Sequence, residues 1–352
     1  MWRHDSRLTD GFASQAHRVC ASGERTAPGY DFGMERGVTP TWVTSAGVVV
    51  VAGKGGVGSS TVAAALSLIA ARQGANVLLI AVDGRPGLGP LLGGEPIGPE
   101  ERTLRSFGRS GRIRGRTIPP EQAFSDYLAL KGIGGVLRKA ASAASLDVIA
   151  AATPGLEHLL VLGKIKELQR EKSADLIIVD APPAGLAAPF LRSASALQAV
   201  VASGPIRTQA DEVAEMLADA KRCQGLLVTI PEETPVNEVV ELAYDIEEKL
   251  GLSLGPLVVN ACWPYLAGLE MSPTAAARAQ GVTLSRAAKA ALDVSARFGR
   301  ARMEGQQRQL ARLDELLPLA RIELPRVPTA RFGPAELDIL AAALAVEPRA
   351  AS

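Results

Sequence analysis

The sequence predicts an α/β protein built on a doubly wound, mostly parallel sheet. Its short apolar runs are continuous rather than alternating, which is typical of strands buried on both faces. Longer helical segments lie between the runs, and this order gives right-handed crossovers. The predicted strands are Val48–Ala52, Asn76–Val82, Asp175–Asp180, Leu197–Ser203, Gly225–Ile230 and Gly255–Ala261. Polar residues directly follow several of these runs, at the sheet edge where such folds bind ligands.

The helical segments follow the same order along the chain. STVAAALSLIAARQG, TQADEVAEMLADAKRC and VNEVVELAYDIEEKLG have the apolar spacing of helices. Residues 284–319 are predicted to form a further helix, residues 320–324 a last strand, and AELDILAAALA a last helix. We predict one domain over residues 46–348, with a helical insertion at about residues 121–170.

The N-terminal segment, residues 1–45, is polar and lacks a periodic pattern, as is typical of a disordered tail. Met34 precedes the first strand closely, which favours an over-extended start site over a targeting role, because the tail lacks the pattern of a transit peptide. No apolar run approaches the ~20 residues that a membrane helix requires. These features predict a cytoplasmic protein.

Composition excludes several functional classes. The net charge of +1 gives no reason to expect a nucleic-acid partner. Cys20, Cys223 and Cys262 form no C-x-x-C pair, and the three histidines are scattered. Thiolate metal sites, disulfide frameworks and Ser-His-Asp chemistry are therefore not indicated. The arginine-rich run from Arg102 to Arg116 is predicted to be a solvated loop, with an anion-binding surface as the alternative.

The sequence GKGGVGSST follows the first strand and opens a helix. Its glycines, at positions 53, 55, 56 and 58, let the backbone come close to phosphate oxygens. Successive N–H groups and the helix N-terminus then form an anion site. Ser60 stands where a Mg²⁺-binding hydroxyl belongs, with Thr61 beside it. The alternative is a tight strand–helix turn with no ligand.

Ser59 occupies the position where a Walker A loop, G-x-x-x-x-G-K-[ST], carries its lysine. That lysine neutralises charge that develops in phosphoryl transfer. Loss of one such donor costs about 10²–10³ in rate. We therefore expect nucleotide binding to survive on backbone amides and Mg²⁺, and hydrolysis to be weakened.

Two aspartates end predicted strands. Asp180 terminates the apolar run DLIIVD, as a carboxylate that holds Mg²⁺ or water does in such folds. Asp83 follows the second strand within VDGRPG, which is also a good turn. For both residues the alternative is a cap or turn role.

The loop resembles the deviant Walker A motif, K-G-G-x-G-K-[ST]-T, of the MinD/ParA/nitrogenase-iron-protein superclass of P-loop NTPases. The resemblance places Lys54 at the signature lysine, which reaches the phosphates of the partner subunit in a nucleotide-sandwich dimer. It also implies that Gly53–Thr61, including Val57 and Ser59, contact ATP, and that Ser60 and Asp180 hold Mg²⁺. On this reading the chain keeps the lysine that acts across the dimer and lacks the one that acts within its own site.

Within that superclass, the chain is similar to the arsenical-pump-driving and tail-anchored-protein-targeting ATPases, and in particular to their actinobacterial anion-transporting branch. IAVDGRPGLGPLLG resembles their switch I, where Asp83 would position the attacking water. IIVDAPPAGLAAPFL resembles switch II. TIPEETPVNEVV implies that Glu232 lies near the nucleotide, and LVVNACWP implies that Asn260 reads the adenine.

Departures from the family pattern limit what can be transferred. Ala184 and Leu186 replace the threonine and histidine that are common in switch II, and the paired and clustered cysteines of the family are absent. Neither arsenite transport nor tail-anchor targeting follows, and the sequence identifies no membrane or protein client. The leading hypothesis is an ATP-binding subunit of a homodimer or, preferably, of a heterodimer with a lysine-containing paralogue. Alternatives are a slow homodimeric ATPase, a scaffold without nucleotide, and a partition-type ATPase.

Overall fold

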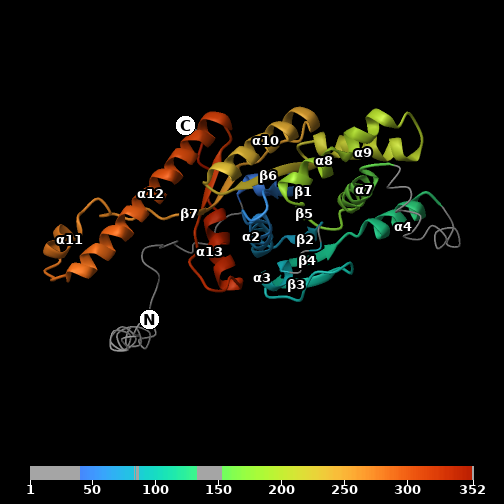
Figure 1. The fold of residues 1–352 in the computed structure, drawn as a ribbon. Coiled ribbons are helices and arrows are strands. Elements are labelled where there is room, and N and C mark those ends of the chain that lie inside the picture. Colours follow the sequence, from blue (N-terminus) through green and yellow to red (C-terminus); the bar gives the residue numbers. More distant parts are fainter. Residues whose placement is uncertain (1–39, 83, 85–86, 133–152, 351–352) are drawn as a thin grey trace, which may run out of the picture. The chain divides into compact units, whose positions relative to one another are not determined.

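The computed structural model describes residues 40–82, 84, 87–132 and 153–350 (Figure 1). The strands are β1 (Val48–Gly53), β2 (Asn76–Ala81), β3 (Arg102–Phe107), β4 (Gly111–Thr117), β5 (Leu176–Asp180), β6 (Cys223–Thr229), β7 (Leu257–Cys262) and β8 (Arg321–Pro325). The helices are η1 (Thr41–Val43, a 3-10 helix), α2 (Ser59–Arg72), α3 (Leu88–Leu91), α4 (Pro120–Leu130), α7 (Leu156–Arg170), α8 (Ala184–Val200), α9 (Pro205–Ala218), α10 (Glu233–Leu250), α11 (Pro273–Ala279), α12 (Arg286–Leu316) and α13 (Pro334–Leu344).

The strands form one sheet in the order β3-β4-β2-β5-β1-β6-β7-β8. Every neighbouring pair is parallel except β3 and β4. The chain leaves β1 toward β2 on one side and later returns to β6 on the other side. The carboxyl end of β1 is therefore a topological switch point, the position at which open α/β sheets bind ligands.

Helices cover both faces of the sheet. Alternate residues of β1, Val48, Val50 and Ala52, belong to the buried cluster that includes side chains of α7, α8, α9 and α10. Val49 and Val51 are equally buried, and successive strand residues point to opposite faces. On that opposite face α2 packs against the sheet and against α13. The predicted doubly wound architecture is confirmed.

Two predicted elements are wrong. The apolar run at residues 197–203 was expected to be a strand, but its first part ends helix α8. The buried apolar residues of this helix are Ala187, Phe190, Leu191, Ala194 and Leu197, which follow the helical period. Val200 is 76% exposed, so the run is not buried on both faces as a central strand would be. A short apolar run alone does not separate a buried strand from a helix end.

The arginine run is the second correction, because it forms the hairpin of β3 and β4 rather than a loop. Leu104 and Ile113 are the buried large apolar residues of this hairpin, and each lies between two polar residues in the sequence. Arg114 pairs with Glu101, and Arg105 lies 3.9 Å from Asp338. These two arginine side chains therefore form ion pairs within the chain, at the edge of the sheet.

The described part of the chain also bears on the predicted tail and insertion. Helix η1 and the fully buried Val43 lie before residue 46, within the last residues of the predicted tail. Residues 1–39 and 133–152 lie outside the described residues, and the remainder of the insertion is α4 and α7. None of the helices in the described ranges combines the length and apolar character that a membrane span needs.

Candidate functional site

The loop between β1 and α2 requires glycine at several positions. A Cβ at Gly53 would lie 2.3 Å from the carbonyl oxygen of Val228 on β6. Gly56 and Gly58 both have φ of 91°, the left-handed region that favours glycine. Glycine is therefore required at positions 53, 56 and 58 to build this turn at the switch point.

Helix α2 begins directly from the loop. Its N-cap is Gly58, which has no side chain to cap the first N–H groups. Such N–H groups and the positive end of the helix dipole attract anions. This helix N-terminus is where the sequence predicts phosphate to bind, and that role stays a prediction.

Ser60 and Asp180 lie together beside this loop. The Ser60 hydroxyl donates to Oδ2 of Asp180 over 2.8 Å. Asp180 ends β5, pairs with Val51 of β1 and is 1% exposed. Carboxylate and hydroxyl oxygens fit Mg²⁺, which binds one or two protein oxygens together with phosphate and water. The two residues predicted to hold the metal thus share one place in the fold.

Ser59 is buried, with 6% of its surface exposed. Its Oγ would lie 2.8 Å from a Cβ built on Gly53, so the side chain is turned back toward the end of β1. Within the described ranges, this hydroxyl has no hydrogen-bond partner. The Ser59 side chain therefore does not replace the function of a loop lysine, and its contribution to phosphate binding would come from its backbone N–H.

Lys54 is held by a residue far along the sequence. Its Nζ lies 2.6 Å from Oε1 of Glu238 on α10, and both side chains are about one-third exposed. Sequence reasoning missed Glu238, because nothing in the helical pattern of α10 distinguishes it from its acidic neighbours. The signature position is thus occupied by an ammonium group that already has an anionic partner within the chain.

Asn260 contacts the loop as well. Its amide Nδ2 donates to the carbonyl oxygen of Val57 over 2.8 Å. Asn260 lies on β7, beyond β6 from β1, so the contact joins the loop to a strand that is not its neighbour. The predicted adenine contact of Asn260 remains a prediction.

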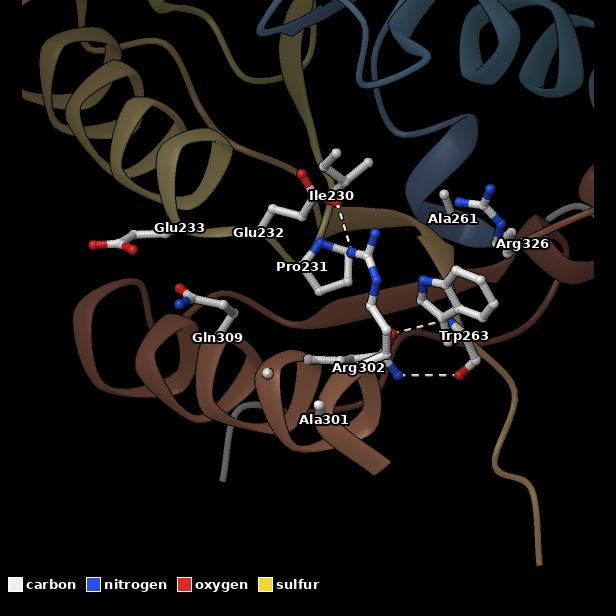
Figure 2. Close-up of a pocket in the computed structure, with 12 residues that line it drawn as sticks. Ile230, Pro231, Glu232, Glu233, Ala261, Trp263, Ala301, Arg302, Gln309 and Arg326 are labelled. Carbon is white, nitrogen blue, oxygen red and sulfur yellow. Dashed lines mark hydrogen bonds and ion pairs between the residues drawn. The ribbon is translucent and has the colours of Figure 1, made fainter. Parts of the chain in front are cut away.

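Glu232 lies at the edge of a cavity of about 290 Å³ at the carboxyl ends of β6 and β7 (Figure 2). It is the N-cap residue of α10, and its Oε1 lies 3.4 Å from Nη1 of Arg302 on α12. Ala261, the neighbour of Asn260 in the sequence, also lines the cavity. Glu232 is thus close in the fold to the loop-contacting strand β7.

Trp263 forms one wall of the same cavity. The guanidinium groups of Arg302 and Arg326 lie 5.7 and 4.5 Å from its ring centroid. Gln306 accepts a hydrogen bond from the Trp263 backbone N–H and donates to its carbonyl. These residues were not predicted, although Arg326 directly follows the last strand, where ligand-binding residues are expected.

The remaining predicted residues are placed less specifically. Gly55 is exposed in the loop, Val57 is buried, and Thr61 lies beside Ser60 in the first turn of α2. Asp83 lies outside the described residues. Burial raises the pKa of both Cys223 and Cys262 to about 12, so these thiols are packing groups. Among the described residues, no three His, Cys, Asp or Glu side chains gather as metal ligands.

The mostly parallel sheet and its glycine loop at the end of β1 define the chain as a P-loop NTPase fold. Comparison with known proteins makes this more specific. Residues 46–208 match the model of the anion-transporting ATPase family. ATPase BagA of Mycobacterium tuberculosis is 36% identical over 188 residues, which cover 51% of this chain and 54% of the relative. ATPase get3 of Neurospora crassa is 26% identical over 164 residues, or 44% of each chain.

Residues 46–208 are thus similar to the anion-transporting ATPase family. The chain spans about half the length of the curated relatives it matches. The matched region contains the phosphate loop and Asp180. Glu232, Glu238 and Asn260 lie beyond the end of the family match.

Proposed function

We propose that this chain binds ATP and Mg²⁺ as one subunit of a nucleotide-sandwich dimer and that its own site hydrolyses ATP poorly. The proposal rests on the contrast between Ser59 and its surroundings. The glycine turn and the Ser60–Asp180 pair suit a nucleotide site, whereas the Ser59 side chain is buried and faces Gly53. Binding groups are kept where the charged catalytic group is missing.

Each group has a defined part in this proposal. The N–H groups of Gly53–Thr61 and the start of α2 hold the phosphates. Ser60 and Asp180 hold Mg²⁺, which supplies charge neutralisation when it is bound. The adenine lies toward β7 and the cavity bordered by Glu232. Asp83 positions the attacking water, as in the family.

The dimer is proposed to be a heterodimer with a paralogue that carries the loop lysine. Lys54 of this chain would then complete the partner's site, and ATP bound here would be chiefly structural. A homodimer in which two copies of Lys54 partly compensate for Ser59 is the second candidate. Two observations support either dimer: Gly55 and Gly56 are exposed in the loop, and the Lys54 ammonium, which pairs with Glu238 in this chain, is about one-third exposed.

Calorimetry with Mg-ATP on the purified chain, together with a turnover assay, tests the proposal. We expect binding with very slow turnover, and Ser59→Lys should raise turnover by about 10²–10³. Ser59→Ala is the matched control and should change neither quantity, because the hydroxyl faces Gly53. Absence of binding in both the native chain and Ser59→Lys would leave the scaffold hypothesis instead.

A further inference from the structure

We propose that Asn260 is a positioning residue that fixes the Val57–Gly58 peptide of the phosphate loop in its phosphate-binding orientation. The inference rests on the proposed ATP-binding function and assigns Asn260 a role other than adenine recognition. Its basis is the 2.8 Å hydrogen bond from the Asn260 amide to the Val57 carbonyl. This bond joins residues 203 positions apart in sequence.

The orientation of this peptide decides what charge it presents to a phosphate. A trans peptide carries its N–H on the side opposite its carbonyl oxygen. While Asn260 holds the Val57 oxygen, the Gly58 N–H is directed to the other side. If the peptide turned over, a carbonyl oxygen would replace that N–H, and its partial negative charge would repel phosphate oxygens.

Glycine at position 58 makes such a flip accessible. Gly58 has φ of 91°, and glycine populates positive and negative φ with similar ease. The flip rotates ψ of Val57 and φ of Gly58, so the glycine removes the usual steric barrier on one side. Val57 is held separately, because its side chain is buried and its N–H donates to the Lys54 carbonyl over 3.3 Å. The peptide after Val57 is therefore the part of the loop that needs an external hydrogen bond.

Strand β7 is shaped to supply that bond. Val259 and Cys262 face Glu323 and Pro325 of β8, so Asn260 and Ala261 together oppose a single residue. Such a bulge turns side chains away from the regular alternation. Ala261 has φ of 55°, a strained conformation for alanine that recurs at functional positions. The strained residue, Ala261, is thus the direct neighbour of Asn260, which contacts the loop.

The contact is also tight against Gly58. A Cβ at that position would lie 2.4 Å from Nδ2 of Asn260. Glycine therefore serves two purposes here, since it adopts positive φ and leaves room for the amide. Asn260 in this position faces the loop backbone, whereas a residue that reads adenine must face the base.

Ligands that share a triphosphate but differ in their base separate the two roles. Affinities of Mg-ATP, Mg-GTP and Mg-tripolyphosphate for the full chain are to be measured by calorimetry, in the native protein and in Asn260→Ala. We expect Asn260→Ala to weaken all three by a similar factor of about 2–10, the value of one hydrogen bond between uncharged groups. Asn260→Asp, which keeps the shape but places an anionic acceptor against the carbonyl, should weaken them further.

Asn76→Ala is the matched control. It also removes a side-chain amide, but at the amino end of β2, where Asn76 accepts from Arg112 and Arg114. It should leave all three affinities unchanged, and thermal unfolding confirms that each variant is folded. A loss confined to ATP overturns the positioning role and favours base recognition, and no loss at all overturns both roles. If the native chain binds none of the ligands, the proposed function itself fails.

Discussion

The part of the chain that matches the family model and the part beyond it contribute differently to the candidate site. Residues 46–208 carry the glycine turn, Ser60 and Asp180, the groups that we expect to touch phosphate and metal. Residues 209–350 provide Glu238 and Asn260, each of which bonds to the loop. The matched part therefore carries the groups expected to bind phosphate and metal. The part beyond it contacts two loop residues, Lys54 and Val57, and restrains their orientation.

The two contributions also differ in strength. The glycine turn is fixed by close backbone packing, where one added atom forces the structure to shift. The contacts from α10 and β7 are single side-chain interactions, each worth about 1 kcal/mol or less. Perturbations in the first part should therefore have larger effects than perturbations in the second.

Gly53→Ala should have the largest effect. The added Cβ would lie 2.3 Å from the Val228 carbonyl oxygen and 2.8 Å from Ser59 Oγ, so β1 or β6 must shift. We expect a loss of about 3 kcal/mol in the free energy of unfolding, measured by urea denaturation. Gly185→Ala is the control, since its Cβ would meet no atom within 4 Å and should change stability by less than about 0.5 kcal/mol. Equal effects at the two positions would contradict this account of the loop.

The sequence predicted the turn well, because its geometry depends on local chemistry. Four glycines between a valine-rich strand and a helix specify both the bend and the exposed N–H groups. The resemblance to the deviant Walker A superclass implied one metal site for Ser60 and Asp180, and in the structure these two side chains are hydrogen-bonded to each other. Glu238 could not be found in this way. Its contact with Lys54 depends on how α10 packs, and α10 has several acidic residues that look equivalent in sequence.

The same limit explains the misassigned strand at residues 197–203 and the missed hairpin of β3 and β4. In both cases, the pattern of apolar residues was too short to define a period. The hairpin is stabilised by ion pairs such as that of Arg114 with Glu101. The local sequence pattern does not predict such pairs. Predictions were accurate where backbone chemistry decides the structure and failed where packing decides it.

The ion pair between Lys166 on α7 and Glu212 on α9 joins the two parts outside the site and should give the next largest effect. Lys166 is 7% exposed and also donates to Gln209 over 3.2 Å. Glu212→Gln would leave a buried ammonium without its carboxylate. Because about half of the Glu212 side chain is exposed, solvent screens the pair, and we expect a loss of about 1–2 kcal/mol in the free energy of unfolding.

The pH dependence of stability provides a second measurement on this pair. The hydrogen bond from Lys166 lowers the pKa of Glu212 below its ordinary value of 4.5. A lowered pKa stabilises the folded chain above the unfolded-state value, and this contribution is lost as pH falls through the folded-state pKa. The difference between native protein and Glu212→Gln should therefore shrink below about pH 4.5. Glu215→Gln, the same change at an exposed position of α9, should leave stability close to unchanged.

Glu238→Gln should give the smallest effect and bears most directly on the comparison. Glu238 neutralises Lys54 within the chain, and the proposed dimer requires that ammonium group to reach a partner's phosphates. Removing the carboxylate should therefore strengthen association of the chain in the presence of Mg-ATP, by about 2- to 5-fold in the dissociation constant. Sedimentation equilibrium of the full chain measures this shift.

Glu241→Gln is the matched control for that experiment. It makes the same change in charge on the same helix, three residues further on, at an exposed side chain. If both variants strengthen association equally, the cause is the lower negative charge of α10, and the Glu238 contact has no special role. If only Glu238→Gln acts, the part of the chain beyond the family match restrains the lysine that the matched part supplies. The loop would then be controlled from both sides, by Glu238 through Lys54 and by Asn260 through Val57.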